Sequence, residues 1–357
     1  MVSKCSKKEK KYSEREFYVW KKKAVNKKQM EKEKRNEQNT GLEQLIERLS
    51  ARIEETNVSI SNKELIKLCR NYNESILSDD PHIFHEIAEA ALNLLIKRNF
   101  AEKWAKRAQA EPASFVAEIV KPLAGKLPTQ TWRSRLQTIR QQFSTPPAIA
   151  YLLQYLVNCR KGEVVLEPSA GTGSLIVWSQ NRVFCNEIDS RRSEMLRVLG
   201  FSSTAYDAEF INDHLPAEIR PDCLLMNPPF SSSGGRTERN SSRYGFRHVE
   251  SALERLKRGG KFGIILGEAS GLDTKTGRDF WSRLSDIVEV KAIIKISGSE
   301  YYKNGTTVDV NIIIGKKHRE FQKIDCRKMM SQIVCVSART VEKAFEETQK
   351  LNLRLDQ

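Results

Sequence analysis

The residues of this chain best suited to chemistry lie in the stretch Asp222-Cys-Leu-Leu-Met-Asn-Pro-Pro-Phe230. Its apolar run over 223–226 predicts a short buried strand, and the two prolines that follow remove backbone donors and fix φ. Pro228 also disfavours a helical conformation at Asn227, so the chain leaves the strand extended and rigid. The Asn227 side-chain oxygen and the Pro228 carbonyl are therefore predicted as fixed acceptors at the carboxyl end of a strand, where open α/β sheets bind ligands.

Two acceptors in this arrangement can each take one hydrogen of an exocyclic amino group on a nucleobase. Such a nitrogen is a poor nucleophile because its lone pair is delocalised into the ring, and the acceptors would orient it for attack. Phe230 offers a face on which the base can stack. An ordinary strand followed by a Pro-Pro turn is the alternative, since proline pairs are common in loops.

A second motif, Val164-Val-Leu-Glu-Pro-Ser-Ala-Gly-Thr-Gly173, runs from an apolar strand into a turn at the expected start of a helix. Gly171 and Gly173 permit a tight turn and close approach of a ligand. The motif is not the full dinucleotide fingerprint, because Ile176 occupies the place of the third glycine. The carboxylate of Glu167 would also repel a diphosphate, so the turn suits a ligand with a cationic or amino-acid end.

The next two predicted strands end in Asn186-Glu-Ile-Asp189 and Ala205-Tyr-Asp207. Glu187 lies about twenty residues beyond the glycine turn, where an acidic side chain can bind both ribose hydroxyls. The carboxylate of Asp207 could accept a hydrogen bond from an adenine amino group. Each carboxylate alone could be a surface charge or a helix cap, but three acidic strand ends followed by Asn-Pro-Pro-Phe argue against chance.

The elements that must position these residues alternate between strands and helices from residue 143 onward. Strands are expected at 163–167, 182–187, 203–207, 223–226, 261–266, 289–296 and 308–315, and helices at 147–156, 191–199, 248–257 and 278–284. This series predicts an α/β fold with a mostly parallel sheet and helices on both faces. The connection holding Tyr301-Tyr-Lys-Asn-Gly-Thr306 is too short for a crossover helix, so the last two strands should be antiparallel.

Ahead of the sheet, the sequence predicts an all-helical domain at 41–142. The apolar residues of its first helix follow helical spacing, and they are Leu42, Leu45, Ile46, Leu49 and Ile53. Ser61 and Glu64 form a candidate capping box, Asp80-Pro81 is expected to begin a long helix to about Lys106, and further helices are expected over 113–120 and 131–142. Residues 1–40 hold too little apolar surface for a core and are expected to be disordered or marginally helical. Residues 319–357 are expected as a C-terminal extension.

The charge of the 357-residue chain is +15 and unevenly spread. Residues 1–40 carry 14 Lys/Arg against 6 Asp/Glu, 41–96 carry 5 against 10, and 97–142 carry 10 against 3. The two basic segments suggest a partner with a phosphate backbone, and a solvated basic surface is the alternative. No apolar run is long enough to span a bilayer. The 7 cysteines lack C-x-x-C spacing and the 5 histidines are dispersed, so we expect reduced thiols, a cytoplasmic protein and no metal site.

The order Phe143-Ser-Thr-Pro146, Glu-Pro-Ser-Ala-Gly-Thr-Gly, Glu-Ile-Asp, Tyr-Asp and Asn-Pro-Pro-Phe resembles the S-adenosylmethionine-dependent DNA adenine-N6 methyltransferases. With the Thr-Pro segment first, it is similar to their gamma arrangement, over about residues 140–318. The resemblance implies a Rossmann-like class I methyltransferase domain at 143–318, with S-adenosylmethionine as cofactor and no metal. It also implies methyl transfer to the N6 amino group of an extruded adenine in DNA. Such a restriction–modification enzyme would be bacterial or encoded by a mobile element.

The resemblance implies a set of cofactor-binding residues, namely Thr145, Pro146, Glu167, Ala170, Gly171, Glu187, Asp207 and Asn227. Thr145 and Pro146 would lie at the methionine end, while Glu187 would hold the ribose and Asp207 the adenine. The target base would be held by Asn227, Pro228 and Phe230. A further aromatic residue should stack on the base, with Tyr301 and Tyr302 as candidates and Tyr302 preferred. Arg236, Arg239 and Arg243 of the following loop could contact phosphates, and a flexible surface insertion is the alternative.

The chain departs from many gamma enzymes because residues 316–357 are too few for their large target-recognition domain. Sequence choice would then come from the helical domain or from a separate specificity subunit. The helical domain resembles, in architecture only, the modification subunits of type I restriction systems. RNA guanine-N2 or adenine-N6 methyltransferases and protein glutamine methyltransferases remain alternatives on the same fold, although the Phe-x-Thr-Pro segment argues against them. A subunit that binds nucleic acid without catalysis is a second alternative.

Overall fold

The fold was determined as a computed structural model, which describes residues 41–72, 82–130, 144–229, 244–321 and 325–356. The tail at 1–40, the Asp80-Pro81 helix start and the helix expected at 131–142 lie outside these residues. Among the described helices, none qualifies as a membrane-spanning segment.

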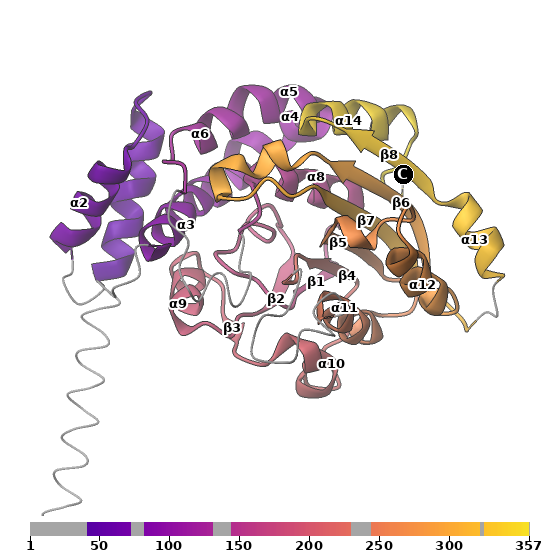
Figure 1. The fold of residues 1–357 in the computed structure, drawn as a ribbon. Coiled ribbons are helices and arrows are strands. Elements are labelled where there is room, and N and C mark those ends of the chain that lie inside the picture. The colour runs from indigo at the N-terminus through magenta and orange to yellow at the C-terminus, as the bar shows by residue number, and fades with distance from the viewer. Residues whose placement is uncertain (1–40, 73–81, 131–143, 230–243, 322–324, 357) are drawn as a thin grey trace, which may run out of the picture.

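A mixed sheet of eight strands forms the centre of the molecule (Figure 1), in the order β3-β2-β1-β4-β5-β7-β6-β8. The strands are β1 Val164–Glu167, β2 Arg182–Asn186, β3 Ser203–Thr204, β4 Cys223–Met226, β5 Lys261–Gly267, β6 Val288–Ile296, β7 Val310–Lys317 and β8 Val334–Ala338. Among the strands of the described residues, β7 alone runs antiparallel to its neighbours, β5 and β6. The mostly parallel sheet and its antiparallel pair β6–β7 are therefore confirmed.

Helices precede the sheet and alternate with its strands. An unlabelled first helix covers 41–55. The others are α2 Asn62–Tyr72, α3 His82–Asn99, η2 Phe100–Trp104, α4 Ala105–Ala110, α5 Pro112–Phe115, η3 Val116–Val120, α6 Lys121–Gly125, α8 Pro147–Val157, α9 Ser190–Val198, η4 Ala208–Phe210, α10 Ile211–His214, α11 Tyr244–Arg255, η6 Glu268–Ser270, α12 Lys275–Leu284, η7 Gly298–Asn304, α13 Cys326–Gln332 and α14 Val341–Lys350.

The N-terminal helices form as their sequence pattern predicts. The five apolar residues of the first helix are all buried. At the start of α2, the Ser61 hydroxyl accepts a hydrogen bond from the backbone N–H of Glu64 at 3.1 Å, which is one half of the capping box. The expected long helix continues beyond α3 through a π-helical turn, η2, into α4 and ends at Ala110.

Both faces of the sheet are covered because successive side chains of a strand point to opposite sides. In β4, Cys223 and Leu225 belong to the core shared with α8 and α14, whereas Leu224 and Met226 belong to the core shared with α11 and α12. Figure 1 shows α14, α8 and the α4–α6 helices above the sheet and α10–α12 below it. The apolar run of β4 thus reflects burial on both faces.

An aromatic cluster joins the N-terminal helices to the sheet region and to the C-terminal segment. The Tyr151 ring of α8 lies 5.3 Å from Phe115 of α5 and 4.9 Å from Trp178 between ring centroids. Phe345 of α14 lies 5.9 Å from the same tyrosine. The helices, the sheet and the C-terminal segment therefore share one core, and β8 extends the sheet by pairing in parallel with β6.

One expected element has a different form. The glycine turn leads into consecutive turns over 171–178 and not into a regular helix. Two of its carbonyls accept hydrogen bonds from side chains, that of Thr172 from Asn93 Nδ2 at 2.8 Å and that of Leu175 from Gln154 Nε2 at 3.2 Å. These side chains of α3 and α8 occupy acceptors that a regular helix would use internally.

Candidate active site

The Asn-Pro-Pro turn is held in place by the Thr-Pro segment. Asn227 follows β4, and its Nδ2 donates a hydrogen bond of 2.8 Å to the hydroxyl of Thr145, the residue before Pro146 and α8. The Asn227 Oδ1 is buried and has no hydrogen-bond partner among the residues that the structure describes. Buried polar atoms are normally paired, so this oxygen is an acceptor available to a ligand. The hydrogen bond from Nδ2 to Thr145 fixes the direction in which it points. The following Pro228 is buried.

The glycine turn after β1 packs against the end of β2. Gly171 and Gly173 have φ of +56° and +91°, which non-glycine residues rarely adopt. The N–H of Ala170 donates to the carbonyl of Asn186 at 2.9 Å, and that of Gly171 donates to Glu187 Oε2 at 2.7 Å. Glu187 thereby links the two strand ends that the sequence assigns to the cofactor.

Two carboxyl groups are buried at these strand ends. Glu167 is 1% exposed; its Oε1 accepts from the N–H of Ser169 at 3.0 Å, and its Oε2 has no partner within the described part of the chain. Glu187 is 4% exposed, and its Oε1 accepts from the N–H of Asp189. Desolvation raises the pKa of both carboxyl groups, and in Glu187 the nearby Arg192 guanidinium opposes the rise. A cationic ligand would relieve this cost, as the sequence predicted for this turn.

Asn186 organises this edge of the sheet, although the sequence analysis assigned it no role. Its Nδ2 donates to the carbonyls of Pro168 and Tyr206 at 3.0 and 2.9 Å. Its Oδ1 accepts from the N–H of Tyr206 and the hydroxyl of Thr204, both at 2.8 Å. The buried carboxamide thus fixes the turns after β1 and β3 relative to β2. An asparagine directly before the acidic strand end was the only local signal.

Asp207 lies after β3, where its Oδ1 accepts from the N–H of Glu209 and caps η4. Two apolar side chains near these acidic strand ends are exposed, Ile188 by 54% and Phe210 by 43%. Exposed apolar groups beside acceptors suit a purine, which is flat, apolar on its faces and polar at its edges. The sequence analysis missed both residues, although Ile188 directly follows Glu187.

A group of potential metal ligands includes Asp207. Ligand atoms of Asp207, Glu209 and His248 lie within 4.8 Å of one another. Glu209 also pairs with Arg247 at 3.0 Å. The absence of a metal therefore stays a prediction.

The two candidate stacking residues occupy different environments on η7. Tyr301 is fully buried in the core, so neither face of its ring is exposed. Tyr302 is 63% exposed. Of the two, only Tyr302 can receive a base without rearrangement of the core. Phe230, Arg236, Arg239 and Arg243 lie outside the described residues, and their roles stay predictions.

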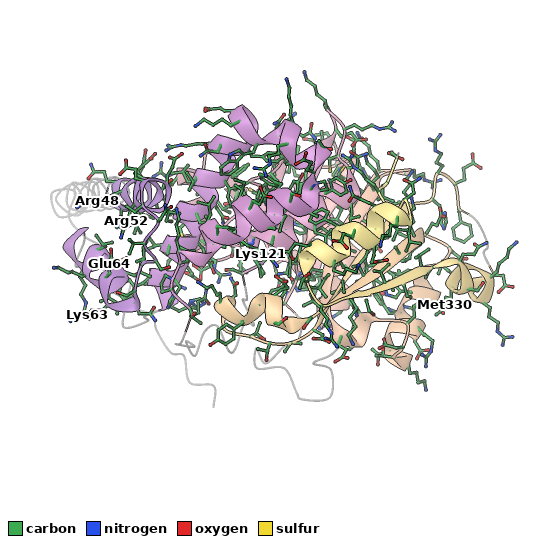
Figure 2. The ribbon with its side chains drawn as sticks, turned by 90° about the horizontal axis from the view of Figure 1, so that it is seen from above. Arg48, Arg52, Lys63, Glu64, Lys121 and Met330 are labelled. Carbon is green, nitrogen blue, oxygen red and sulfur yellow. The ribbon has the colours of Figure 1, made fainter. Side chains whose placement is uncertain are left out.

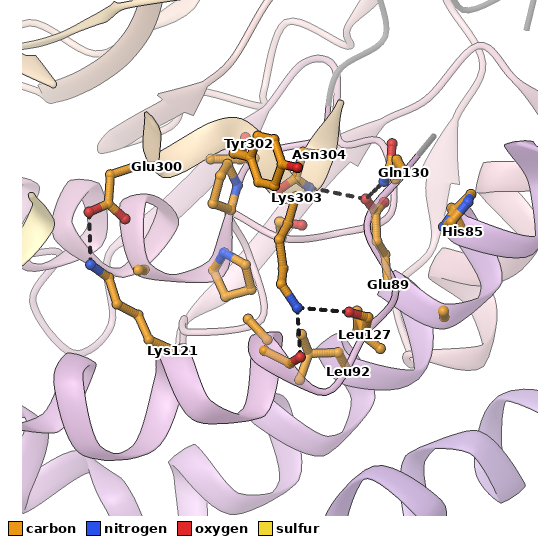
Figure 3. A pocket seen from close by; sticks show the side chains of 18 of the residues that line it. His85, Glu89, Leu92, Lys121, Leu127, Gln130, Glu300, Tyr302, Lys303 and Asn304 are labelled. Atoms are coloured by element: carbon orange, nitrogen blue, oxygen red, sulfur yellow. Dashed lines mark hydrogen bonds and ion pairs between the residues drawn. The ribbon is translucent and has the colours of Figure 1, made fainter. Parts of the chain in front are cut away.

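Tyr302 lines a cavity of about 270 Å³ between the N-terminal helices and the part of the chain that forms the sheet. Its walls come from α3, α6, the segment 127–130, the start of α8 and η7 (Figure 3). Lys121 pairs with Glu300 at 2.8 Å, and Lys303 Nζ donates to the carbonyl of Gly125 at 2.6 Å. The cavity also reaches Thr145 and Pro146, so it adjoins the residue that orients Asn227.

Several lysines and arginines of residues 97–130 are paired with other groups of the same chain. Arg98 pairs with Glu47 at 2.7 Å, Lys126 Nζ donates to the carbonyl of Ile53 at 2.7 Å, and Lys121 also pairs with Glu342 at 2.7 Å. At the end of the molecule formed by the first helix and α2 (Figure 2), Arg52 pairs with Glu64 at 3.4 Å. These pairs reduce the number of cations that residues 97–130 can offer to phosphates.

The chain was compared with protein families, with other sequences and with solved structures. No protein-family model matches the chain. The type II restriction enzyme and methyltransferase RM.BcgI of Heyndrickxia coagulans is 26% identical over 151 residues, which cover 35% of this chain and 23% of that protein. This chain therefore matches less than a quarter of that relative's length.

Two solved structures align with the chain at low sequence identity. A putative class I S-adenosylmethionine-dependent methyltransferase from Listeria monocytogenes has a TM-score of 0.50 and 12% identity, covering 90% of this chain and 99% of that chain. The M protein of the type I restriction enzyme EcoKI has a TM-score of 0.44 and 14% identity, covering 78% of this chain and 71% of that chain. The chain has the class I methyltransferase fold and, over part of its length, resembles restriction–modification methyltransferases.

Proposed function

We propose that this chain transfers a methyl group from S-adenosylmethionine to the exocyclic N6 amino group of adenine in DNA. The observation that carries the proposal is the orientation of the Asn227 carboxamide. Its Nδ2 is held by Thr145, while its Oδ1 is buried and unpaired within the described residues. A buried unpaired acceptor is costly, and an amino group of the substrate would satisfy it.

The residues at the strand ends fit the cofactor. Glu187 would hold the ribose hydroxyls, Asp207 the adenine amino group, and the turn at Ala170 and Gly171 would allow close approach of the amino-acid portion. The unpaired buried Oε2 of Glu167 and the raised pKa of its carboxyl group favour a cationic partner at this turn. Bound S-adenosylmethionine would supply the electrophilic methyl group.

The chain's own contribution to the reaction is to position the nucleophile. Asn227 Oδ1 and the Pro228 carbonyl each accept one hydrogen of the amino group, which directs the nitrogen lone pair out of conjugation and toward the methyl donor. Both acceptors also stabilise the positive charge that develops on that nitrogen during transfer. Tyr302 and Phe230 would stack on the extruded base, which pays part of the cost of unstacking it.

DNA is proposed as the substrate because the sequence relative is a restriction enzyme and methyltransferase. The described residues after β7 form β8, α13 and α14 and largely complete the sheet and its cover. Selection of the DNA sequence by the N-terminal helices or by a separate specificity subunit is part of the same proposal.

The direct test is transfer of a radiolabelled methyl group from the cofactor to DNA, RNA and protein in parallel. Wild type should label DNA, with the label recovered as N6-methyladenine. Asn227→Ala should lose about 100-fold or more of the rate because the amino group is no longer oriented. The matched control is Asn181→Ala, since Asn181 Oδ1 binds the N–H of Gly162 at the opposite edge of the sheet. Labelling of RNA or protein alone, or full activity of Asn227→Ala, would contradict the proposal.

A further inference from the structure

Glu89 of α3 lies where three segments distant in sequence meet. Its Oε1 accepts hydrogen bonds from Gln130 Nε2 at 2.6 Å and from Asn304 Nδ2 at 3.2 Å (Figure 3). Its Oε2 lies 3.4 Å from the hydroxyl of Thr172 in the glycine turn. The side chain is 8% exposed, so a potentially charged group is held in the interior by neutral donors alone in these contacts.

The Glu89 carboxyl group lines the 270 Å³ cavity together with Thr145 and Ser174. Thr145 is hydrogen-bonded to Asn227, and Ser174 directly follows Gly173. This end of the cavity therefore adjoins both the proposed site of methyl transfer and the glycine turn. The methionine end of the cofactor is expected at this junction. Apolar walls formed by Ala88 and Pro146 would accommodate a short carbon chain.

The cations around the cavity are engaged with other groups. Arg192 of α9 pairs with Glu86 at 2.7 Å, and Lys121 pairs with Glu300 and Glu342. Lys303 donates to the carbonyls of Gly125 and Leu127. His85, one turn before Glu89, has its pKa lowered to about 4 by burial and so carries no charge near neutrality.

The Glu89 carboxyl group is consequently poised between its two protonation states. Burial is the largest cause that raises its pKa, to about 7, and the charge of Glu86 adds to the rise. Hydrogen bonds from Ser144 and Gln130 and the charge of Arg192 oppose it. A ligand cation placed beside this carboxyl group would stabilise its ionised form.

We propose that Glu89 binds the α-ammonium group of the cofactor's amino-acid end, in the cavity beside Thr145. The inference rests on the proposed function and adds a residue from the N-terminal helices to the cofactor site. An ammonium group carries three donors and one positive charge, and each carboxylate oxygen can accept more than one hydrogen bond. The N-terminal helices would then take part in cofactor recognition as well as in packing.

The test compares two thioethers that carry no charge at sulfur and differ in the amino-acid end. S-adenosylhomocysteine has that end, and 5′-methylthioadenosine lacks it. Calorimetry on the full chain measures both affinities. Glu89→Gln should lower the affinity for S-adenosylhomocysteine by about 10-fold or more, because a charge-assisted hydrogen bond is lost. The affinity for 5′-methylthioadenosine should stay within about 2-fold of the wild-type value, because this ligand has no group near Glu89 and distant sites contribute independently. Glu118→Gln, which changes an exposed acid on η3, is the matched control and should alter neither affinity.

The pH dependence supplies a second readout. Below pH 7, the free carboxyl group of Glu89 is protonated in a growing fraction of molecules and must lose its proton to bind the ammonium. Wild-type affinity for S-adenosylhomocysteine should therefore rise between about pH 6 and pH 8, and the rise should be smaller in Glu89→Gln. Other buried acids, among them Glu167 and Glu187, are present in both proteins, so the difference reports Glu89.

Equal weakening of both thioethers in Glu89→Gln would show that Glu89 only supports the fold, and it would overturn the inference. Unchanged affinity for S-adenosylhomocysteine would do so as well, while leaving the proposed function intact. A loss selective for S-adenosylhomocysteine in Glu167→Gln but not in Glu89→Gln would assign the ammonium to Glu167 instead. Failure of the wild type to bind any adenosyl ligand would overturn the proposed function together with this inference.

Discussion

The carboxyl edge of the sheet has two halves that differ in how firmly their side chains are held. The cofactor half consists of the turns after β1, β2 and β3. There, Glu187 accepts two backbone N–H groups, and the Asn186 carboxamide makes four hydrogen bonds. The substrate half consists of residues 227–229 and η7. Among the described residues, the Asn227 carboxamide makes one hydrogen bond, and Tyr302 is 63% exposed.

This difference suggests an order of assembly. Groups that are already fixed can bind a ligand without further loss of side-chain entropy, and the cofactor half meets this condition. The substrate half leaves an acceptor and an aromatic face to be satisfied by a ligand. We therefore expect the cofactor to bind a site that exists beforehand, and the target base to complete the second half on arrival.

The largest expected effect comes from Asn186→Ala. Removal of this buried carboxamide leaves its partners at the end of β3 and in the turns after β1 and β3 unsatisfied, which should lower the free energy of unfolding by about 2–4 kcal/mol. The displaced turns should also weaken cofactor binding, on the order of 10-fold. Denaturant unfolding and calorimetry measure the two effects.

Asn227→Ala is the matched substitution in the substrate half. It removes one hydrogen bond to Thr145, so stability and cofactor affinity should stay close to those of the wild type while methyl transfer is lost. If Asn186→Ala binds the cofactor as tightly as the wild type and loses only methyl transfer, the division into two halves is wrong.

A smaller effect is expected from Tyr302→Ala. Base–aromatic stacking contributes about 1–3 kcal/mol, so KM for DNA should rise by about 5- to 150-fold. Stability should change little, because the ring is largely exposed. Tyr302→Phe keeps the ring and is the control. Steady-state kinetics at one salt concentration separate KM from kcat. An unchanged KM for DNA in Tyr302→Ala would remove this residue from the base site.

The parts of the fold that depend on local chemistry could be predicted from the sequence. The apolar run that ends at two prolines predicts β4 with the bounds that the structure shows, 223–226. The short connection after β6 predicts that β6 and β7 are antiparallel. The positive φ of Gly171 follows from the need for a tight turn. In each case neighbouring residues determine the outcome.

The parts that depend on distant contacts could not be predicted. The turns over 171–178 replace a helix because Asn93, 79 residues earlier, occupies the carbonyl of Thr172. Glu89 is 83 residues from the same threonine, and its position in an alanine-rich helix gives no sign of a buried carboxyl group. β8 was missed because its place in the sheet depends on parallel pairing with β6, a segment distant in sequence.

The smallest expected effect concerns Gly245, which packs α11 against the Asn-Pro-Pro turn. A Cβ at this position would lie 2.8 Å from the carbonyl oxygen of Pro229, closer than real Cβ contacts. Because that oxygen belongs to a rigid backbone, either α11 or the Pro-Pro turn must shift when the glycine is replaced.

Gly245→Ala therefore sets two effects against each other. Alanine has the higher helix propensity, by about 1 kcal/mol at an interior position and less in a first turn, so stability should change little. The shifted turn moves the Asn227 and Pro228 acceptors, and small displacements of positioned groups cost rate. We expect kcat to fall several-fold, which corresponds to a rise of about 1 kcal/mol in the activation free energy. The affinity for S-adenosylmethionine should stay unchanged. The control is Asn181→Ala, whose side chain binds the N–H of Gly162 at the opposite edge of the sheet. A loss of cofactor affinity in Gly245→Ala equal to the loss of kcat would mean that the two halves of the edge move together.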